Sequence, residues 1–204
     1  MRGLQIFRVI TWSLIALLGA WLAVFSGLLP FGESNRDGSS RDGTPAIGKP
    51  FELVSHEGKT VNNAVLMGKP YLAFFGFTHC PDICPTTLFE LTGLMKELGP
   101  KADQLNVVFI TVDPERDTRE LLSAYMTAFD PRIIVLRGSP ERTDQAVKAF
   151  AAFAKKVPTD GGSYTMDHTA GVYRMDAEGR FKGTLDMHEP QDVRLRKVQD
   201  LIEG

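Results

Sequence analysis

The chain has 204 residues, of which 43% are hydrophobic and 24% are charged, and its formal net charge is −2. A charge this close to zero argues against nucleic acid as a partner. The chain contains only two cysteines, Cys80 and Cys84, so any thiol chemistry depends on this pair.

The first feature in chain order is an uncharged apolar run at residues 9–31, rich in Leu, Ala, Ile, Val and Trp. At about 1.5 Å of rise per residue, a helix of this length crosses a hydrocarbon core of roughly 30 Å. Arg2 and Arg8 precede the run, so the positive-inside rule leaves residues 1–8 in the cytoplasm and exports the rest. We expect a single transmembrane anchor in a bacterial inner membrane, with the soluble domain in the periplasm, where disulfides are permitted.

A cleaved signal peptide is the alternative interpretation of this run. The run is longer than an h-region of roughly 7–15 residues, and no clear A-x-A cleavage site follows it, so we favour the uncleaved anchor. Residues 32–49 are dominated by Gly, Ser, Asn, Asp, Arg and Pro, which predicts a flexible tether. Residues 50–204 are then long enough for one compact domain with a sizeable core.

Apolar patterns in residues 50–204 predict alternating strands and helices. The predicted strands are Phe51–Val54 and Thr60–Val61 (a hairpin), Tyr71–Phe77, Leu105–Val112, Arg132–Leu136, Thr169–Met175 and Arg180–Leu185. The predicted helices are Ile83–Leu98, Asp117–Phe129 with Asp117 near its cap, one that starts at Ser139 with Phe150 and Phe153 on its apolar side, and Pro190–Ile202. This order predicts an α/β domain with a central mixed β-sheet flanked by helices. A thiol pair after the first central strand is the order that a thioredoxin-like fold requires.

The two cysteines lie where the strand that ends at Phe77 passes into the helix that begins at Ile83. Residues four apart are separated by about one helical turn, so both thiols can share a face, and the helix dipole is expected to lower their pKa. Such a pair can cycle between dithiol and disulfide, or it can hold a soft metal ion. A plain stabilising disulfide is a third interpretation, although so short a loop removes little unfolded-state entropy.

A metal site needs more than these two donors. Structural zinc takes about four ligands, whereas Cu(I) accepts two or three, with thiolate and imidazole both suitable. The candidates for a third donor are His56, His79, His168 and His188. His168 is favoured because it lies at the start of a predicted strand after a Gly-rich loop, which can bring it back toward the first helix. The others are interpreted as loop or surface residues.

Two aspartates are candidates for the surroundings of the site. Asp82 lies between the cysteines, and Asp113 ends the second central strand. A carboxylate near a metal or a thiol pair tunes the local charge or orients a ligand. For Asp113, capping of the following helix is an equally good interpretation.

Three segments, Phe77–Pro85, Val112–Thr118 and Tyr164–His168, resemble the Sco/SenC family. Members of that family are membrane-tethered copper chaperones of thioredoxin-like fold that serve cytochrome c oxidase assembly. The resemblance covers nearly the whole chain after the tether. It implies copper on Cys80, Cys84 and His168, with Asp113 near the site. Met166 departs from the β-branched residue expected before Asp-His, and its thioether is a candidate for an additional soft ligand.

The resulting prediction is a membrane-anchored copper metallochaperone. It would deliver copper, as Cu(I) or alternatively Cu(II), to the dinuclear copper site of cytochrome c oxidase subunit II, with other copper chaperones as further partners. The alternative is a thiol–disulfide oxidoreductase that reduces the cysteines of that apo-site or of another exported protein. Both functions use Cys80 and Cys84, but only the first needs His168. A redox or copper sensor is a third hypothesis, for which the sequence shows no output domain.

Overall fold

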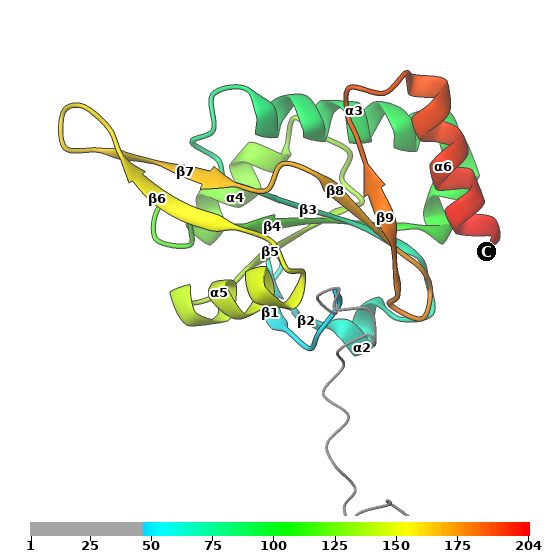
Figure 1. Cartoon of the computed structure of the whole chain (residues 1–204), viewed down its shortest axis with the longest axis horizontal. Coiled ribbons are helices and arrows are strands. Elements are labelled where there is room, and N and C mark those ends of the chain that lie inside the picture. The colour runs from blue at the N-terminus through cyan, green and yellow to red at the C-terminus, as the bar shows by residue number, and fades with distance from the viewer. Residues whose placement is uncertain (1–46) are drawn as a thin grey trace, which may run out of the picture. The chain divides into compact units, whose positions relative to one another are not determined.

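A seven-stranded sheet runs through the part of the chain that the computed structural model describes, residues 47–204 (Figure 1). The strands stand in the order β2-β1-β5-β4-β3-β8-β9, with bounds β1 Glu52–Ser55, β2 Thr60–Asn62, β3 Tyr71–Gly76, β4 Asn106–Thr111, β5 Ile133–Arg137, β8 Val172–Met175 and β9 Phe181–Leu185. Strands β3, β4 and β5 are parallel, and the other neighbours pair antiparallel. The prediction of a central mixed sheet is therefore confirmed.

The predicted anchor at residues 9–31 and nearly all of the predicted tether at residues 32–49 lie outside the described residues. Within residues 47–204, no helix combines the length and the apolar character that a membrane span requires. The anchor, the tether and the domain boundary at residue 50 stay predictions.

Helices cover both faces of the sheet (Figure 1). Their bounds are α2 Asn63–Leu66, α3 Ile83–Leu98, α4 Arg119–Met126, α5 Pro140–Ala149 and α6 Gln191–Glu203, with a 3-10 helix at Gly99–Gln104. Strands β3, β4 and β5 follow one another in the chain and lie side by side, in parallel, in the sheet. Right-handed crossovers between them therefore place α3 and α4 on the same face. Helix α6 packs beside α3 on that face, and α5 lies on the opposite one.

The two central strands are buried on both faces, which explains their continuous apolar runs. All six residues of β3 are buried, and so are five of the six in β4. Neighbouring residues of a strand point to opposite faces. Phe74 therefore stacks on Phe109 at a centroid distance of 5.8 Å, while Phe75 packs against Phe150 at 5.5 Å on the other side.

A ribbon outside the main sheet departs from the predicted strands. It pairs β6 (Ala154–Pro158) with β7 (Tyr164–His168) antiparallel, and the Gly-rich loop at residues 160–163 is its turn. Every residue of β6 is half-buried or exposed, so no alternating apolar face marks this strand in the sequence. The prediction of one strand at Thr169–Met175 is therefore wrong in its start, because His168 ends β7 and β8 begins only at Val172.

The N-cap of α4 lies one residue beyond Asp117. The N-cap is Thr118, whose Oγ1 accepts a hydrogen bond from the amide of Leu121. The prediction of a cap near Asp117 is confirmed, because the cap is the next residue, and the Asp117 carboxylate itself turns inward and binds other partners.

The end of α5 also differs from the prediction. The helix stops at Ala149, and Ala151 has a positive φ of 48°, which an α-helix cannot include. Phe150 is buried as predicted, but Phe153 lies beyond the turn and is 50% exposed. The assignment of Phe153 to the apolar side of the helix is therefore wrong.

Candidate metal centre

Three predicted site residues, Cys80, Cys84 and His168, come together in space, although Cys84 and His168 are 84 positions apart in the chain. One donor atom from each lies within 4.8 Å of the other two. Two sulfurs bonded to the same ion at about 2.3 Å are at most about 4.6 Å apart, so the spread is close to what a shared ion requires. Within residues 47–204, no other group of three His, Cys, Asp or Glu residues has this geometry.

Cys84 lies in the first turn of α3 and is completely buried. Its thiol fits against the end of β3 because Gly76 has no side chain. A Cβ at Gly76 would lie 2.8 Å from the Cys84 sulfur and 2.7 Å from the ring of Phe109. Contacts this short are repulsive, so the close approach of helix and strand requires glycine at this position.

Burial changes the pKa of the Cys84 thiol in the opposite direction from the one predicted for a helix N-terminus. Desolvation raises the pKa of Cys84 well above its ordinary value of 9.0, and the neighbouring Cys80 raises it further. The prediction of a lowered thiol pKa is therefore wrong for this residue. The physical reason is that the free-energy cost of taking the thiolate out of water exceeds the stabilisation that the partial charge at the helix end provides.

Cys80 lies in the loop that precedes α3, because the helix begins only at Ile83. The two thiols therefore do not share a helical face as i and i+4 residues. Instead the backbone amide of Cys84 donates a hydrogen bond to the Cys80 sulfur at 3.4 Å. Both cysteines are free, and Cys80 is the more exposed of the two. An N–H of the first helical turn, which has no partner within the helix, thus binds the Cys80 sulfur.

His168 ends β7 with its imidazole turned toward Cys84. Its Nδ1 lies 3.0 Å from the carbonyl oxygen of Thr169, which accepts the ring proton, and its Nε2 lies 3.6 Å from the Cys84 sulfur. Phe77 and Phe74 pack edge-on against the ring at centroid distances of 5.7 and 6.4 Å. Burial lowers the pKa of His168 below its ordinary value of 6.5. The neutral imidazole, which is the form that binds metals, is therefore favoured.

Asp113 is buried, and both of its carboxylate oxygens have protein partners. Tyr164 donates its hydroxyl to Oδ1 at 2.8 Å, and Arg116 donates Nε to Oδ2. The Arg116 guanidinium also donates to the carbonyl of Tyr164 at 2.8 Å and stacks on its ring. Asp113 does not belong to the donor cluster and does not cap α4. Its contacts instead connect it to the strand that carries His168.

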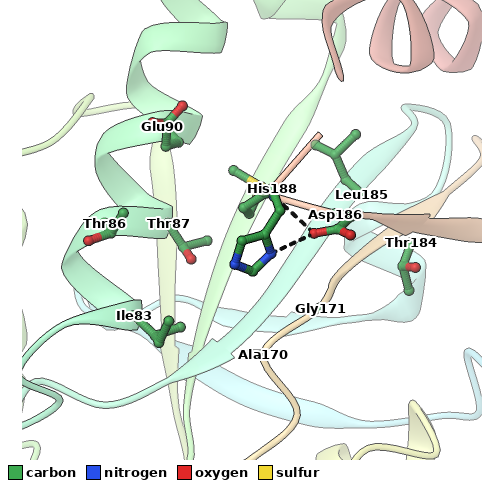
Figure 2. Close-up of a pocket in the computed structure, with 11 residues that line it drawn as sticks. Ile83, Thr86, Thr87, Glu90, Ala170, Gly171, Thr184, Leu185, Asp186 and His188 are labelled. Atoms are coloured by element: carbon green, nitrogen blue, oxygen red, sulfur yellow. Dashed lines mark hydrogen bonds and ion pairs between the residues drawn. The ribbon is translucent and has the colours of Figure 1, made fainter. Parts of the chain in front are cut away.

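The remaining polar candidates do not belong to the donor cluster. Asp82 is exposed, and its Oδ1 accepts a hydrogen bond from the hydroxyl of Thr86 at 3.4 Å. His79 is 47% exposed. His188 is 90% exposed and pairs with Asp186 at 3.0 Å, in a pocket of about 340 Å³ between α3 and the end of β9 (Figure 2).

The residues that hold this centre in place are not identified by the sequence alone. They are Gly76, which admits the Cys84 thiol, Thr78 with Asp117 beneath the Cys80 loop, and Tyr164 beside Asp113. Gly76 carries a readable signal, since a glycine in an otherwise bulky strand often marks a close approach. The inward turn of the Asp117 carboxylate leaves no such signal, because aspartate is equally typical of a helix cap.

Fold and cluster together define a thioredoxin-like domain with a site of soft donors. The chain belongs to the SCO1/SenC family, whose sequence model matches residues 39–203. The resemblance predicted from the sequence is thereby confirmed.

Two curated relatives illustrate the extent of the similarity. The chain is 36% identical over 160 residues to the SCO2-like protein RP587 of Rickettsia prowazekii, covering 78% of this chain and 76% of that protein. It is 35% identical over 142 residues to the human mitochondrial protein SCO1 homolog, covering 68% of this chain and 47% of that protein. The matched part therefore spans less than half of the human protein.

Two solved structures with copper bound share the fold. ScoI of Bradyrhizobium japonicum has 44% sequence identity and a TM-score of 0.72, covering 76% of this chain and 99% of that chain. Yeast Sco1 has 31% identity and a TM-score of 0.72, covering 78% of this chain and 90% of that chain.

Filling the space at Gly76 should disturb the centre more than the fold. In Gly76→Ala the added methyl meets the Cys84 sulfur, so we expect the thiol to move out of the cluster and a loss of about 1–3 kcal/mol of stability. Gly93→Ala is the matched control, because no atom lies within 4 Å of its added Cβ. Urea unfolding and a competitive Cu(I) titration check both variants. Unchanged Cu(I) affinity in Gly76→Ala would contradict this account of the position.

Proposed function

We propose that this chain is a copper metallochaperone that binds one copper ion at Cys80, Cys84 and His168. It delivers the ion to the dinuclear copper site of cytochrome c oxidase subunit II. The observation that carries this proposal is the convergence of two thiols and one neutral imidazole within 4.8 Å. The copper-bound structures of relatives with the same fold support it.

The donor set favours copper over zinc. Thiolate sulfur is a soft ligand, and Cu(I) accepts a set of two thiolates with one imidazole, whereas structural zinc sites use four ligands. Cu(I) is therefore the proposed cargo, with Cu(II) as the second oxidation state. Asp82 and Asp113 supply no donor atom to the cluster, so Asp113 is proposed to act through the strand that carries His168.

The unequal exposure of the donors suggests how the cargo leaves. Cys84 is fully buried and His168 is half-buried behind the rings of Phe74 and Phe77, whereas Cys80 lies in a partly exposed loop. An incoming thiolate of an acceptor can therefore reach the ion first from the side of Cys80. Ligand exchange would start there, while the inner two donors hold the ion until the acceptor has replaced them.

The proposed location follows from the N-terminal sequence. Residues 9–31 would anchor the chain by a single pass in a bacterial inner membrane, and residues 50–204 would face the periplasm. The tether at residues 32–49 would let the domain reach its partners, which are subunit II and other copper chaperones as donors. The uncharged run behind Arg2 and Arg8 is what supports this part of the proposal.

A thiol–disulfide oxidoreductase is the second candidate. The free thiols of Cys80 and Cys84, with sulfurs no more than 4.8 Å apart, favour it. Exchange would start at Cys80, since Cys84 is buried and its raised pKa keeps it protonated. This function needs no imidazole, so His168 separates the two candidates.

Replacing His168 should therefore abolish delivery and spare thiol exchange. In His168→Ala we expect one of three donors to be lost, a large fall in Cu(I) affinity and a failure of oxidase assembly. The Cys80–Cys84 pair should still oxidise and re-reduce. His188→Ala is the matched control, because this exposed histidine lies outside the cluster. Anaerobic Cu(I) titration of the full-length protein and an oxidase activity assay in cells check these results.

The opposite result would favour the thiol–disulfide oxidoreductase. If oxidase assembly survives in His168→Ala and fails in Cys80→Ser, the metallochaperone proposal is wrong.

The pH dependence of copper binding follows from the buried thiol. Because burial raises the pKa of Cys84, the metal-free protein carries a protonated thiol at neutral pH, and binding of Cu(I) as a thiolate releases that proton. Affinity should therefore fall as the pH falls, by about tenfold per pH unit for each proton released. Since the pKa of His168 lies below 6.5, the imidazole adds to this slope only at lower pH. Competition against a chelator between about pH 6 and 8 measures the slope, and a flat profile would contradict thiolate ligation.

A further inference from the structure

The carboxylate of Asp117 is completely buried beneath the loop that carries Cys80. It accepts hydrogen bonds from three donors: the Thr78 amide, at 3.1 and 3.3 Å from its two oxygens, the Thr78 hydroxyl at 2.6 Å and the Thr111 hydroxyl at 2.5 Å. Among the described residues, the one basic side chain within 4.0 Å is His79, whose Nδ1 is 3.8 Å away. A buried carboxylate without a guanidinium or ammonium partner is costly unless hydrogen bonds satisfy it. The hydrogen bonds to Thr78 and Thr111 are therefore what keeps Asp117 in this place.

These bonds tie together the ends of the two central strands. Thr111 is the last residue of β4 and pairs in register with Gly76, the last residue of β3. Thr78 lies just beyond β3, and Cys80 follows two positions later. The amide of Cys80 has only a long hydrogen bond of 3.3 Å to the carbonyl of Phe77. The bond from the Thr78 hydroxyl to the Asp117 carboxylate, at 2.6 Å, is shorter than the other hydrogen bonds described for residues 78–80.

A second aspartate restrains the other side of the centre. Asp113 holds Tyr164 at the start of β7, and His168 ends the same strand. The amide of Asp117 donates a hydrogen bond to the carbonyl of Asp113 at 2.9 Å, so a single turn after β4 fixes both residues. Their carboxylates nevertheless bind different partners, Thr78 and Thr111 for Asp117 and Tyr164 and Arg116 for Asp113.

We propose that Asp117 is the positioning residue for Cys80, and that it acts independently of the anchor that Asp113 provides for His168. We name residues 77–82 the cysteine arm and residues 164–168 the histidine arm. Within the turn at residues 113–117, Asp117 would hold the cysteine arm and Asp113 the histidine arm. The two aspartates would thus place Cys80 and His168 at the spacing that one ion needs. The role in copper affinity rests on the proposed function, whereas the anchoring of each arm concerns the metal-free protein.

Two mild substitutions separate the anchors. Thr78→Val removes the hydroxyl that donates a hydrogen bond to Asp117, and with it the 3.1 Å contact between that hydroxyl and His79. Tyr164→Phe removes the hydroxyl that donates a hydrogen bond to Asp113. Hydrogen exchange read by mass spectrometry on the reduced, metal-free, full-length protein reports both arms at once. Thr78→Val should speed exchange in the cysteine arm about fivefold, and Tyr164→Phe should do the same in the histidine arm. In each variant the other arm should exchange as in the wild type.

Two controls keep the test independent of general destabilisation. Thr127→Val makes the same substitution at an exposed hydroxyl at the end of α4 and should change neither arm. Thr78→Ser keeps the hydroxyl and should behave as the wild type. Faster exchange in both arms of Thr78→Val, in neither arm, or equally in Thr78→Ser would overturn the proposal.

A copper titration of the same variants distinguishes this proposal from the proposed function. Each single variant should lose about tenfold in Cu(I) affinity, which is what the loss of one hydrogen bond to a charged group supplies. If the arms respond as expected but the wild type binds no copper, the positioning role is supported and the metallochaperone function fails. If the wild type binds copper and Thr78→Val binds it equally tightly, Asp117 does not position Cys80 for the metal.

Discussion

The rest of the centre depends on the contact between the Cys84 thiol and the strand end at Gly76. The helix that carries Cys84 approaches β3 so closely that a single methyl group at position 76 would overlap the sulfur. This contact fixes Cys84 at the carboxyl ends of the parallel strands β3 and β4, where the loop with Cys80 begins. His168, at the end of β7, meets it there. Cys80 and His168 are arranged around the Cys84 thiol, whose position the core itself determines.

The same contact determines the electrostatics of the metal-free site. Burial raises the pKa of Cys84 and lowers that of His168, so both inner donors are neutral near pH 7. Because these two donors are neutral, they bury no charge of their own in the metal-free protein, which favours its stability without the cargo. Binding of a soft cation then exchanges a thiol proton for the metal. This exchange makes the proposed binding reversible, which delivery requires. A partly exposed Cys80 beside the fully buried Cys84 and the half-buried His168 gives an acceptor a defined place to begin.

The sequence predicts the main sheet well and selects the three side chains that converge in space, but it predicts the supporting contacts poorly. Strands such as β3 are recognisable because burial on both faces requires a continuous apolar run. The cysteines and His168 are recognisable because few side chains bind soft metals. The ribbon is not predictable from hydrophobic pattern, because β6 buries no face. Asp117 reads as a helix cap by its position, and only the fold shows that Thr78 and Thr111 lie within reach of its carboxylate.

The central claim is that one copper ion is bound by two sulfurs and one imidazole nitrogen. X-ray absorption spectroscopy of the reduced protein loaded with one equivalent of Cu(I) tests it directly, because sulfur and nitrogen neighbours scatter differently. The account predicts two sulfur neighbours and one nitrogen neighbour per copper, with the nitrogen signal absent in His168→Ala and unchanged in His188→Ala. A copper site with sulfur neighbours alone, or a nitrogen signal that persists in His168→Ala, would contradict it.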